Sequence, residues 1–353
     1  MLNIEKLLKK TIKKYGALTV KEFLNVVLYH EKFGYYRKKN IIGKIGDFTT
    51  SPEISQVFGE ILGNSLLLNS SQLKKNKNIS FIELGPGRGF LTRDILRIIK
   101  KLDYSLFQKI KSIYFLEKAD IFFNNLKTLH NSVNIINDIG KIPDTYNIIF
   151  ANEFFDALPI DQYFYTKKRW YKVLITLDKK DKFTFSLSRQ PVKINYCFPH
   201  DPSEGYTFEC SDYMINLLTS ICKKISLFGG VFILIDYNRN FKEKESSLSA
   251  IKNHTKVDVF HDLGNCDISH SPDFSLIKKI CKINKCSIFG PFTQSLFLQT
   301  YGINQRFDDL IKRNPKFKND LLLQKIRLIG EKYMGNIFKV LVITDNNGLY
   351  KFL

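Results

Sequence analysis

The sequence predicts a doubly wound α/β fold, a sheet flanked by helices, with an N-terminal helical arm and an inserted β-meander. Residues 80–101 give the first indication, because a buried strand runs into a glycine-rich loop and then into a helix. Three further apolar runs each close on an acid or an amide, as strands do where such a sheet meets its ligand. Residues 161–193 instead alternate between apolar and polar side chains, which is typical of a meander.

The chain begins with a predicted helical arm. Residues 3–14 carry apolar side chains at helical spacing with lysines between them, a pattern that would also suit an amphipathic import presequence. Thr19-Val20-Lys21-Glu22 has the spacing of a capping box and predicts a second helix through Tyr29. A basic loop at 37–45 then ends the arm.

A hydroxyl-rich segment at 46–60 follows the arm. Ser51 and Pro52 form a good N-cap and first-turn pair, so we expect one helix from there to about Leu68. An irregular polar loop in front of a helix can form a pocket wall, and it can equally be no more than a helix cap. The residues that would line such a pocket are Asp47, Thr50, Ser51 and Glu53.

The glycine loop after the first strand indicates which ligand the sheet binds. A dinucleotide site needs G-x-G-x-x-G/A, but Phe90 occupies the third small position. The loop is instead Gly85-Pro86-Gly87-Arg88-Gly89, with Glu83 just before it. Backbone without Cβ atoms can lie against a ligand that lacks phosphates, and a carboxylate suits a cationic amino-acid head group. The pattern favours the methyl donor S-adenosylmethionine (SAM) over a glycine turn that binds nothing.

Two later strands close on acids that suit the rest of this cofactor. Glu117 follows the strand at 111–116, where a carboxylate can grip a ribose diol. Asp138 follows the strand at 134–137 and could face an adenine ring. Either acid alone could be a solvated strand end, but their order after the glycine loop favours a role in binding.

The fourth strand, at 146–151, leads into the segment Asn152-Glu153-Phe154-Phe155-Asp156. Enzymes of this architecture place groups against their acceptor at this position. Two carboxylates and an amide around two phenylalanines are costly to bury unless they face a cavity or a cation. We therefore expect Asn152, Glu153 and Asp156 to be catalytic, with Asn152 also contacting the cofactor. The alternative is a helix start with Asn152 as its cap.

The remaining sequence interrupts and then completes the α/β order. The meander has predicted turns near 167–168 and 179–181, and Trp170 within it is expected to pack and not to recognise a ligand. After it we expect a helix at 208–226, a strand at 231–235, a loop at 241–268, a helix at 273–282, a strand at 287–292, a helix through about Met334 and a strand at 337–343.

These elements suggest four segments along the chain. They are the helical arm with the polar loop (1–78), the SAM-binding half of the core (79–160), the meander insertion (161–207) and the remainder of the core (208–353), with a loop insertion at 239–272.

Composition argues against several classes of function. No apolar run approaches the ~18 residues of a membrane span. The six cysteines form no C-x-x-C pair, and His254, His261 and His270 lack ligand spacing, so no metal site is expected. The net charge of +20 could mark a nucleic acid, an anionic surface or an acidic partner. The lysines are spread over the whole chain, however, as in a compositionally biased genome, and no aromatic residues interleave with a basic stripe, so nucleic acid is an unlikely partner.

Three motifs in this order resemble the MidA family of class I methyltransferases: GDFTTSPEISQVFGE (46–60), ELGPGRGFLTRDIL (83–96) and NEFFDALPI (152–160). Smaller similarities, such as Gly34-Tyr35-Tyr36 and Gly290-Pro291, extend the resemblance from about residue 4 to 344. Residues 3–14 are therefore expected to belong to the domain. A bacterial cytoplasmic protein follows, with a mitochondrial matrix location only if a presequence is missing from this chain.

The resemblance implies a Rossmann-like class I methyltransferase sheet with helical and β insertions. Mitochondrial members of the family are complex I assembly factors that methylate an arginine of a core subunit, so the same chemistry on a protein substrate is implied here. We expect Asp47 and Glu53 to contact that substrate. The residues expected to contact SAM are Thr50, Ser51, Glu83, Gly85, Pro86, Gly87, Gly89, Glu117, Asp138 and Asn152.

The sequence departs from the family pattern at two places and leaves other functions open. Asn238 stands where a glycine is expected after Asp236-Tyr237, and Ser271 stands where a family histidine is common. An RNA or small-metabolite acceptor would use the same donor site, and a non-catalytic assembly chaperone would keep it as a structural ligand site. An NAD enzyme is disfavoured by Phe90. The oligomeric state stays open.

Overall fold

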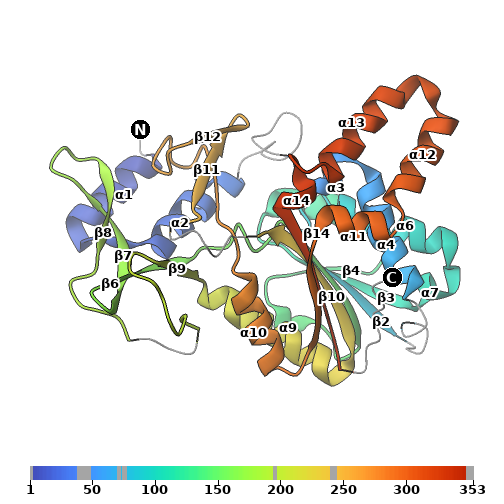
Figure 1. Cartoon of the computed structure of the whole chain (residues 1–353), viewed down its shortest axis with the longest axis horizontal. Coiled ribbons are helices and arrows are strands. Elements are labelled where there is room, and N and C mark those ends of the chain that lie inside the picture. The colour runs from blue at the N-terminus through green and yellow to red at the C-terminus, as the bar shows by residue number, and fades with distance from the viewer. Residues whose placement is uncertain are drawn as a thin grey trace. The chain divides into compact units, whose positions relative to one another are not determined.

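The computed structural model describes residues 3–37, 49–69, 73, 78–193, 197–238 and 245–346. The chain divides into two compact units, each assembled from three separate stretches (Figure 1). Unit 1 comprises Met1–Phe48, Phe155–Asn216 and Arg239–Leu276, and unit 2 comprises Thr49–Phe154, Leu217–Asn238 and Ile277–Leu353.

Unit 2 contains a seven-stranded sheet that confirms the predicted α/β class. Its strands are β2 (Ile79–Leu84), β3 (Ile110–Leu116), β4 (Val133–Ile136), β5 (Tyr146–Asn152), β10 (Gly230–Tyr237), β14 (Ser287–Thr293) and β15 (Phe338–Thr344). They lie in the order β14-β15-β10-β5-β2-β3-β4. Only β15 is antiparallel to its neighbours, and the other pairs are parallel.

The strand order places the predicted site at a topological switch point. From β2 the chain moves outward through β3 to β4, whereas from β5 it moves the opposite way to β10. The crevice between two such diverging halves, at the carboxyl ends of the strands, is where open α/β sheets bind ligands. The glycine loop follows β2 and Glu153 follows β5, and these two strands pair directly.

Helices of unit 2 flank this sheet (Figure 1). They are α3 (Ser51–Ile54), α4 (Gln56–Leu68), α6 (Phe90–Leu102), α7 (Tyr104–Lys109), α8 (Phe123–Lys127), α11 (Gln294–Thr300), α12 (Ile303–Arg313), α13 (Lys318–Ile329) and α14 (Met334–Ile337). Three short 3₁₀ turns, η2 (Asp120–Phe122), η3 (Ile139–Lys141) and η4 (Pro315–Phe317), lie between them. Along the chain, α9 (Asp212–Phe228) and α10 (Phe274–Ile283) each begin in unit 1 and end in unit 2.

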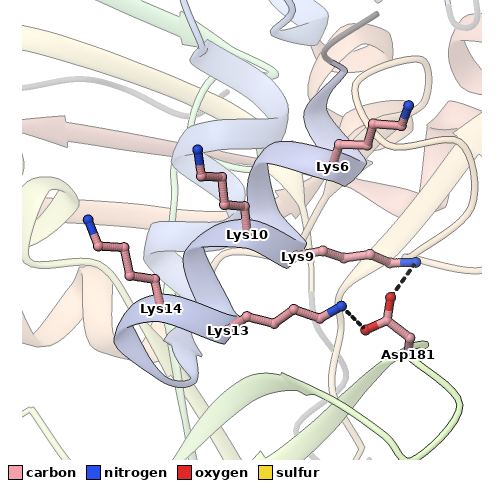
Figure 2. A pocket seen from close by; sticks show the side chains of 6 residues that line it. All are labelled: Lys6, Lys9, Lys10, Lys13, Lys14 and Asp181. Carbon is pink, nitrogen blue, oxygen red and sulfur yellow. Dashed lines mark ion pairs between the residues drawn. The ribbon is translucent and has the colours of Figure 1, made fainter.

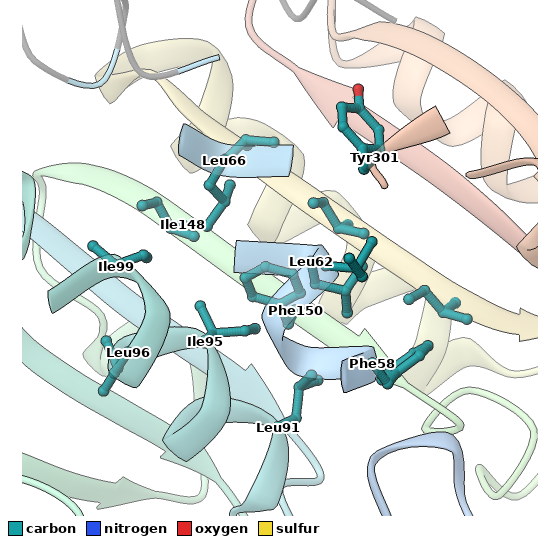
Figure 3. Close-up of a cluster of buried hydrophobic side chains, with 14 of the residues drawn as sticks. Phe58, Leu62, Leu66, Leu91, Ile95, Leu96, Ile99, Ile148, Phe150 and Tyr301 are labelled. Atoms are coloured by element: carbon teal, nitrogen blue, oxygen red, sulfur yellow. The ribbon is translucent and has the colours of Figure 1, made fainter. Parts of the chain in front are cut away.

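The core of unit 2 packs α4 and α6 together next to the sheet (Figure 3). Phe58 and Leu62 of α4, Ile95 of α6 and Phe150 of β5 belong to this cluster, and each is at most 1% exposed. The two helices approach closely because Gly63 has no side chain: a Cβ there would lie 2.3 Å from the Ile98 Cγ2. The start of α6, which bears the glycine loop, is thus held against a rigid core.

Unit 1 combines the N-terminal arm with the meander and the 239–276 stretch. Its elements are α1 (Ile4–Tyr15), β1 (Leu18–Thr19), α2 (Val20–Tyr29), η1 (Tyr35–Arg37), β6 (Asp161–Thr166), β7 (Arg169–Leu177), β8 (Phe183–Leu187), β9 (Thr207–Cys210), β11 (Ser249–Lys252), β12 (Thr255–Val257) and β13 (Asp267–Ser269). One sheet has the order β1-β7-β6-β9, with β8 also paired to β7, and a second has the order β12-β11-β13. The apolar faces of α1 and α2 form the core of this unit with β7.

Local patterns predicted several elements of unit 1 correctly. Asn3 caps α1, and Thr19 and Glu22 form the predicted capping box at the start of α2. The meander is present as β6, β7 and β8, and β6 and β7 are joined by a turn at Lys167 and Lys168, as predicted; both residues have a left-handed φ. Trp170 is buried against aromatic rings, which confirms its packing role.

Two helix predictions were wrong at positions where a residue breaks the helical backbone. The helix expected from Ser51 to Leu68 is two helices, because Ser55 is extended (φ −158°) and its Oγ accepts the Val57 N–H at 3.3 Å to cap α4. Thr50, and not Ser51, is the N-cap residue of α3. The long helix expected to end near Met334 is four helices, with left-handed Gly302 starting α12.

Two other predictions were wrong because strand pairing decided the structure. The helix expected at 208–226 begins only at Asp212, since Thr207–Cys210 pairs with β6 as a strand. The region 241–268, expected to be a loop, contributes β11, β12 and part of β13 to a small sheet. Strands of three or four residues carry too little periodicity to be recognised from sequence.

Candidate functional site

The glycine loop adopts a turn that side chains would disfavour. Gly85, Gly87 and Gly89 have φ values of +64°, +51° and +76°, in the left-handed region that glycine adopts without strain. The Gly85 N–H donates to the Leu116 carbonyl at 3.0 Å, and the Gly89 N–H donates to the Pro86 carbonyl at 2.8 Å. A Cβ on Gly85 would lie 2.6 Å from the Phe154 Cδ2. The loop is therefore a preformed backbone cradle between β2 and α6.

Glu83 lies buried beneath this loop, at 3% exposure. Its Oε2 accepts the Thr92 N–H at 3.3 Å and also the Thr92 hydroxyl. Burial raises the pKa of Glu83 to about 8, although the two bonds from Thr92 oppose the shift. The side chain thus ties the end of β2 to the first turn of α6, and its predicted contact with the cofactor head group stays a prediction.

The raised pKa of Glu83 predicts a specific dependence of stability on pH. Between about pH 4.5 and about pH 8 the folded chain keeps this proton while the unfolded chain has lost it. The free energy of unfolding should therefore fall as the pH rises through this range, and Glu83→Gln should make the fall shallower. Urea denaturation at about pH 6 and about pH 8.5 measures both slopes. An unchanged slope in the variant would show that Glu83 ionises normally in the folded chain.

Glu117 joins the end of β3 to the glycine loop. Its Oε1 accepts the N–H groups of Lys118 and Ala119, both at 2.8 Å, and the carboxylate also accepts the Gly87 N–H. Burial raises its pKa, and these backbone bonds oppose the shift. The structure therefore brings Glu117 to the loop, as expected for a group that holds a ribose.

Asp138 has a local structural role at the end of β4. It is exposed, and its Oδ1 accepts the Gly140 N–H at 2.9 Å as the N-cap of η3. The Asp138 Oδ2 takes no part in this contact and could accept a hydrogen bond from a ligand. The contact of Asp138 with adenine stays a prediction.

At the end of β5, Asn152 and Glu153 form a connected pair. The Asn152 Nδ2 donates to the Glu153 Oε1 at 2.9 Å, and the same oxygen accepts the Ser51 N–H at 3.0 Å. Glu153 has a left-handed φ of +53°, which is unusual for a residue other than glycine. The Asn152 Oδ1 is buried and has no hydrogen-bond partner within the described part of the chain. A buried polar atom without a partner costs free energy, and it indicates a ligand that would supply a donor.

The α3 segment packs the predicted hydroxyl loop onto this pair. Ser51 is the first residue of α3, and its N–H, which has no acceptor within the helix, donates to the Glu153 Oε1. The Ser51 Oγ in turn lies 3.4 Å from the Gln294 Oε1. Of the two readings of this loop, the contact with Glu153 supports the pocket wall.

Glu53 forms an ion pair with Arg88 of the glycine loop, which the sequence analysis did not select as a site residue. The Arg88 Nη1 lies 3.7 Å from the Glu53 Oε1. Burial raises the pKa of Glu53, and the positive charge of Arg88 opposes the shift. Arg88 is the only charged residue among Gly85–Gly89. A charged side chain in the glycine loop is the sequence feature from which this contact could have been suspected.

Asp156 lies in unit 1, three residues along the chain from Glu153. It is 8% exposed, and its backbone carbonyl accepts the His270 N–H at 3.0 Å. Its charge acts on Tyr36, whose hydroxyl donates to the Asp267 Oδ1 at 3.0 Å. Burial, together with these two carboxylates, raises the pKa of Tyr36 well above its usual range.

Tyr36 and Asp267 were missed as candidate site residues. Tyr36 lies in Gly34-Tyr35-Tyr36, one of the smaller similarities to the MidA family. Asp267 lies in Cys266–Phe274, where the sequence departs from the family pattern at Ser271. Asp47, predicted to contact the substrate, lies outside the described residues. The structure thus gathers the predicted donor-binding residues in unit 2 and places Asp156 in unit 1.

Within the part of the chain that the structure describes, no group of three histidine, cysteine or acidic side chains could hold a metal ion. All six cysteines are free thiols and all are buried. Of the helices described, none combines the length and apolar character needed to cross a bilayer.

Comparisons with known proteins show the family to which the chain belongs. Residues 61–292 match the Methyltransf_28 family model, which describes SAM-dependent methyltransferases. The mitochondrial protein arginine methyltransferase NDUFAF7 of Xenopus laevis is 30% identical over 351 residues, which cover 92% of this chain and 79% of that protein. Its human counterpart is 29% identical over 366 residues, covering 96% of this chain and 82% of that protein.

A solved structure supports the fold independently. The COG1565 superfamily protein of Burkholderia thailandensis, crystallised with S-adenosylhomocysteine, superposes with a TM-score of 0.80. The two sequences are 21% identical, and the match covers 97% of this chain and 91% of that one. The similarity therefore extends over both units and includes the insertions as well as the sheet.

Proposed function

Because the chain belongs to the Methyltransf_28 family of SAM-dependent methyltransferases, we propose that it methylates arginine side chains of a protein. The observation that carries this proposal is the Asn152–Glu153 pair at the switch point of the sheet, next to the glycine cradle. Asn152 ends β5 and Glu153 follows it, at the carboxyl edge of the sheet where this fold binds ligands, and the Asn152 Oδ1 is buried. The relatives named as arginine methyltransferases support the choice of acceptor.

In this proposal the residues of unit 2 hold the donor. The backbone of Gly85, Pro86, Gly87 and Gly89 lies against the methionine part, with Glu83, Thr50 and Ser51 around it. Glu117 accepts the ribose hydroxyls, and Asp138 lies at the adenine. Asn152 offers its unpartnered Oδ1 to a donor group of the cofactor. When bound, SAM supplies an activated methyl group, so the chain needs chiefly to orient it, which can lower the barrier by roughly 7–11 kcal/mol.

Carboxylates hold the acceptor. An arginine guanidinium keeps its charge far above neutral pH, so anionic oxygens must bind and polarise it. Glu153 and Asp156 take this role with Asn152, and Asp47 and Glu53 close the pocket. Bound SAM would supply the methyl group, which would pass from its sulfur to one guanidinium nitrogen, and a carboxylate of this set would accept the proton that the nitrogen loses. The net charge of +20 does not attract a cationic substrate. In this proposal these acids must therefore create a local negative field at the acceptor site.

The resemblance to the MidA family also suggests an acceptor protein. We take a respiratory complex I subunit, or its bacterial equivalent, as the acceptor, with methylation supporting assembly. A cytoplasmic location in a bacterium goes with this proposal, and it stays a prediction.

The proposal is tested by following labelled methyl groups from SAM into an extract of cells that lack this protein. We expect label in the protein fraction, sensitive to protease and resistant to ribonuclease, and none with a Gly87→Val control. Label that ribonuclease removes would favour an RNA acceptor. Tight SAM binding without transfer to any fraction would favour the non-catalytic chaperone.

A further inference from the structure

Helix α1 presents a dense cluster of lysines on the surface of unit 1. A pocket of about 540 Å³ is lined by Lys6, Lys9, Lys10, Lys13, Lys14 and Asp181. Four of the five lysines are exposed, and Lys9 is half-buried. Figure 2 shows Lys9 and Lys13 extending toward Asp181, whereas Lys10 and Lys14 leave the helix on its other side. The ammonium groups are therefore distributed over the exposed surface of α1 around this pocket.

Internal ion pairs neutralise only part of this charge. The Lys13 Nζ lies 2.7 Å from Asp181, and the Lys9 Nζ lies 2.9 Å from Glu5 and 3.7 Å from Asp181. Within the described ranges, no ion pair involves Lys6, Lys10 or Lys14. Five lysines against two acids leave three positive charges on about two turns of helix. Because these three lysines are exposed, water and salt screen their mutual repulsion, but together they form a positive surface that attracts anions.

The opposite face of α1 cannot take part in binding. Ile4, Leu8 and Ile12 are at most 7% exposed and belong to the core of unit 1. Any partner must therefore lie on the lysine face and bind through charge, because the apolar stripe of the helix is already used. This distinguishes α1 from an amphipathic helix that inserts into a bilayer.

We propose that this lysine face binds the surface of a membrane that contains anionic phospholipid. Clusters of four to eight basic residues on a helix are the recognised feature of binding to acidic lipid headgroups, at about 1 kcal/mol for each lysine. The side chains are all lysines, which act as point charges and suit a surface of mobile headgroups, and no arginine is present for bidentate contacts to a base or a fixed carboxylate.

The aromatic residues around the cluster favour lipid over nucleic acid. Phe183 lies under Lys9, 5.7 Å from its Nζ, but stacks on Phe260 and is not available to a base. Tyr15, at the end of α1, is 74% exposed and is suited to the headgroup region, where tyrosines are enriched. A groove with successive stacking platforms, as single-stranded nucleic acid requires, is not formed by these residues.

The lysine cluster and Asp181 allow one variant that should weaken vesicle binding and another that should strengthen it. The Asp181 carboxylate pairs with two of the lysines and repels an approaching anion. Removing that charge frees the Lys13 ammonium and leaves Lys9 paired with Glu5 alone, so Asp181→Asn should bind vesicles more tightly. Lys6→Gln/Lys10→Gln/Lys14→Gln removes the three lysines outside the ion pairs and leaves the pairing of Asp181 intact.

Co-sedimentation of the full chain with vesicles measures this binding. We use vesicles of phosphatidylcholine alone and of phosphatidylcholine with phosphatidylglycerol, at low and moderate salt. The control Lys101→Gln/Lys111→Gln/Lys312→Gln removes three exposed lysines of unit 2 and the same net charge. We expect the chain to bind only the phosphatidylglycerol vesicles. Their affinity should fall about tenfold or more in the α1 variant, rise in Asp181→Asn and change much less in the control.

Three results would overturn the proposal. Equal losses in the α1 variant and the control would mean that net charge, and not this face, attracts the vesicles. Binding to phosphatidylcholine alone would mean that apolar contacts dominate. Failure to bind phosphatidylglycerol vesicles, combined with tight binding of an RNA oligonucleotide or an acidic peptide that the α1 variant loses, would assign the face to that other partner. Circular dichroism of each variant shows that unit 1 is still folded.

Discussion

Valine in place of Gly87 is expected to abolish measurable SAM binding. Gly87 has φ +51°, a conformation that costs an L side chain roughly 1–2 kcal/mol, so the loop would shift. Its N–H donates to the Glu117 carboxylate, and the shift would therefore also move the group proposed to hold the ribose. Isothermal titration calorimetry should show a loss of at least about 100-fold in affinity, or roughly 2.8 kcal/mol.

Gly205→Val is the matched control for this prediction. Gly205 also has a left-handed φ, +81°, but it lies in unit 1 and a Cβ there meets no atom within 4 Å. The same backbone strain is thus introduced away from the glycine loop. SAM affinity should be unchanged in this variant. If Gly87→Val binds SAM as tightly as Gly205→Val does, the loop has been assigned to the wrong ligand.

Glu153→Gln is expected to lower methyl transfer by about 100-fold or more while leaving SAM binding within about threefold. Glutamine keeps a carbonyl oxygen that can accept the Ser51 and Asn152 N–H groups, so the local structure should persist. What is lost is the negative charge that holds and polarises the guanidinium. Steady-state assays with labelled SAM, combined with calorimetry, separate the two effects.

Two further variants test whether the loss of methyl transfer is specific to the carboxylates of the proposed acceptor site. Asp309→Asn removes one exposed carboxylate of α12 in the same unit and should leave both transfer and binding unchanged. Asp156→Asn should resemble Glu153→Gln, because both acids are proposed to hold the acceptor. Full activity of Glu153→Gln would show that its carboxylate serves only to anchor α3 to β5.

Elements with a strong local signal could be predicted from the sequence. The run from β2 through the glycine loop to α6 combines a continuous apolar strand, three glycines and an apolar stripe at helical spacing, and it lies within one or two residues of its predicted bounds. The same holds for the capping box of α2, where Thr19 and Glu22 bond each other's backbone. At both places the residues that decide the conformation are neighbours in sequence.

Features that depend on distant residues could not be predicted. Thr207–Cys210 is a strand because β6 pairs with it, and Glu209 accepts the Gln162 amide at 2.8 Å from that neighbouring strand. The pairing of Tyr36 with Asp267 joins positions 231 residues apart. The Ser51 N–H meets Glu153 across 102 residues. The sequence thus predicted a set of residues for the donor site, but not that the Glu153 carboxylate also accepts the Ser51 N–H of the loop in front of it.

The most direct test of the proposed activity is chemical identification of the methylated residue. The purified chain is incubated with methyl-labelled SAM and an extract that lacks it, and the labelled protein is hydrolysed to amino acids and separated. The proposal predicts label in methylated arginine, absent with Gly87→Val and strongly reduced with Glu153→Gln. Label confined to methylated lysine, to another amino acid or to non-protein material would contradict it, because carboxylates at Glu153 and Asp156 are assigned to a guanidinium.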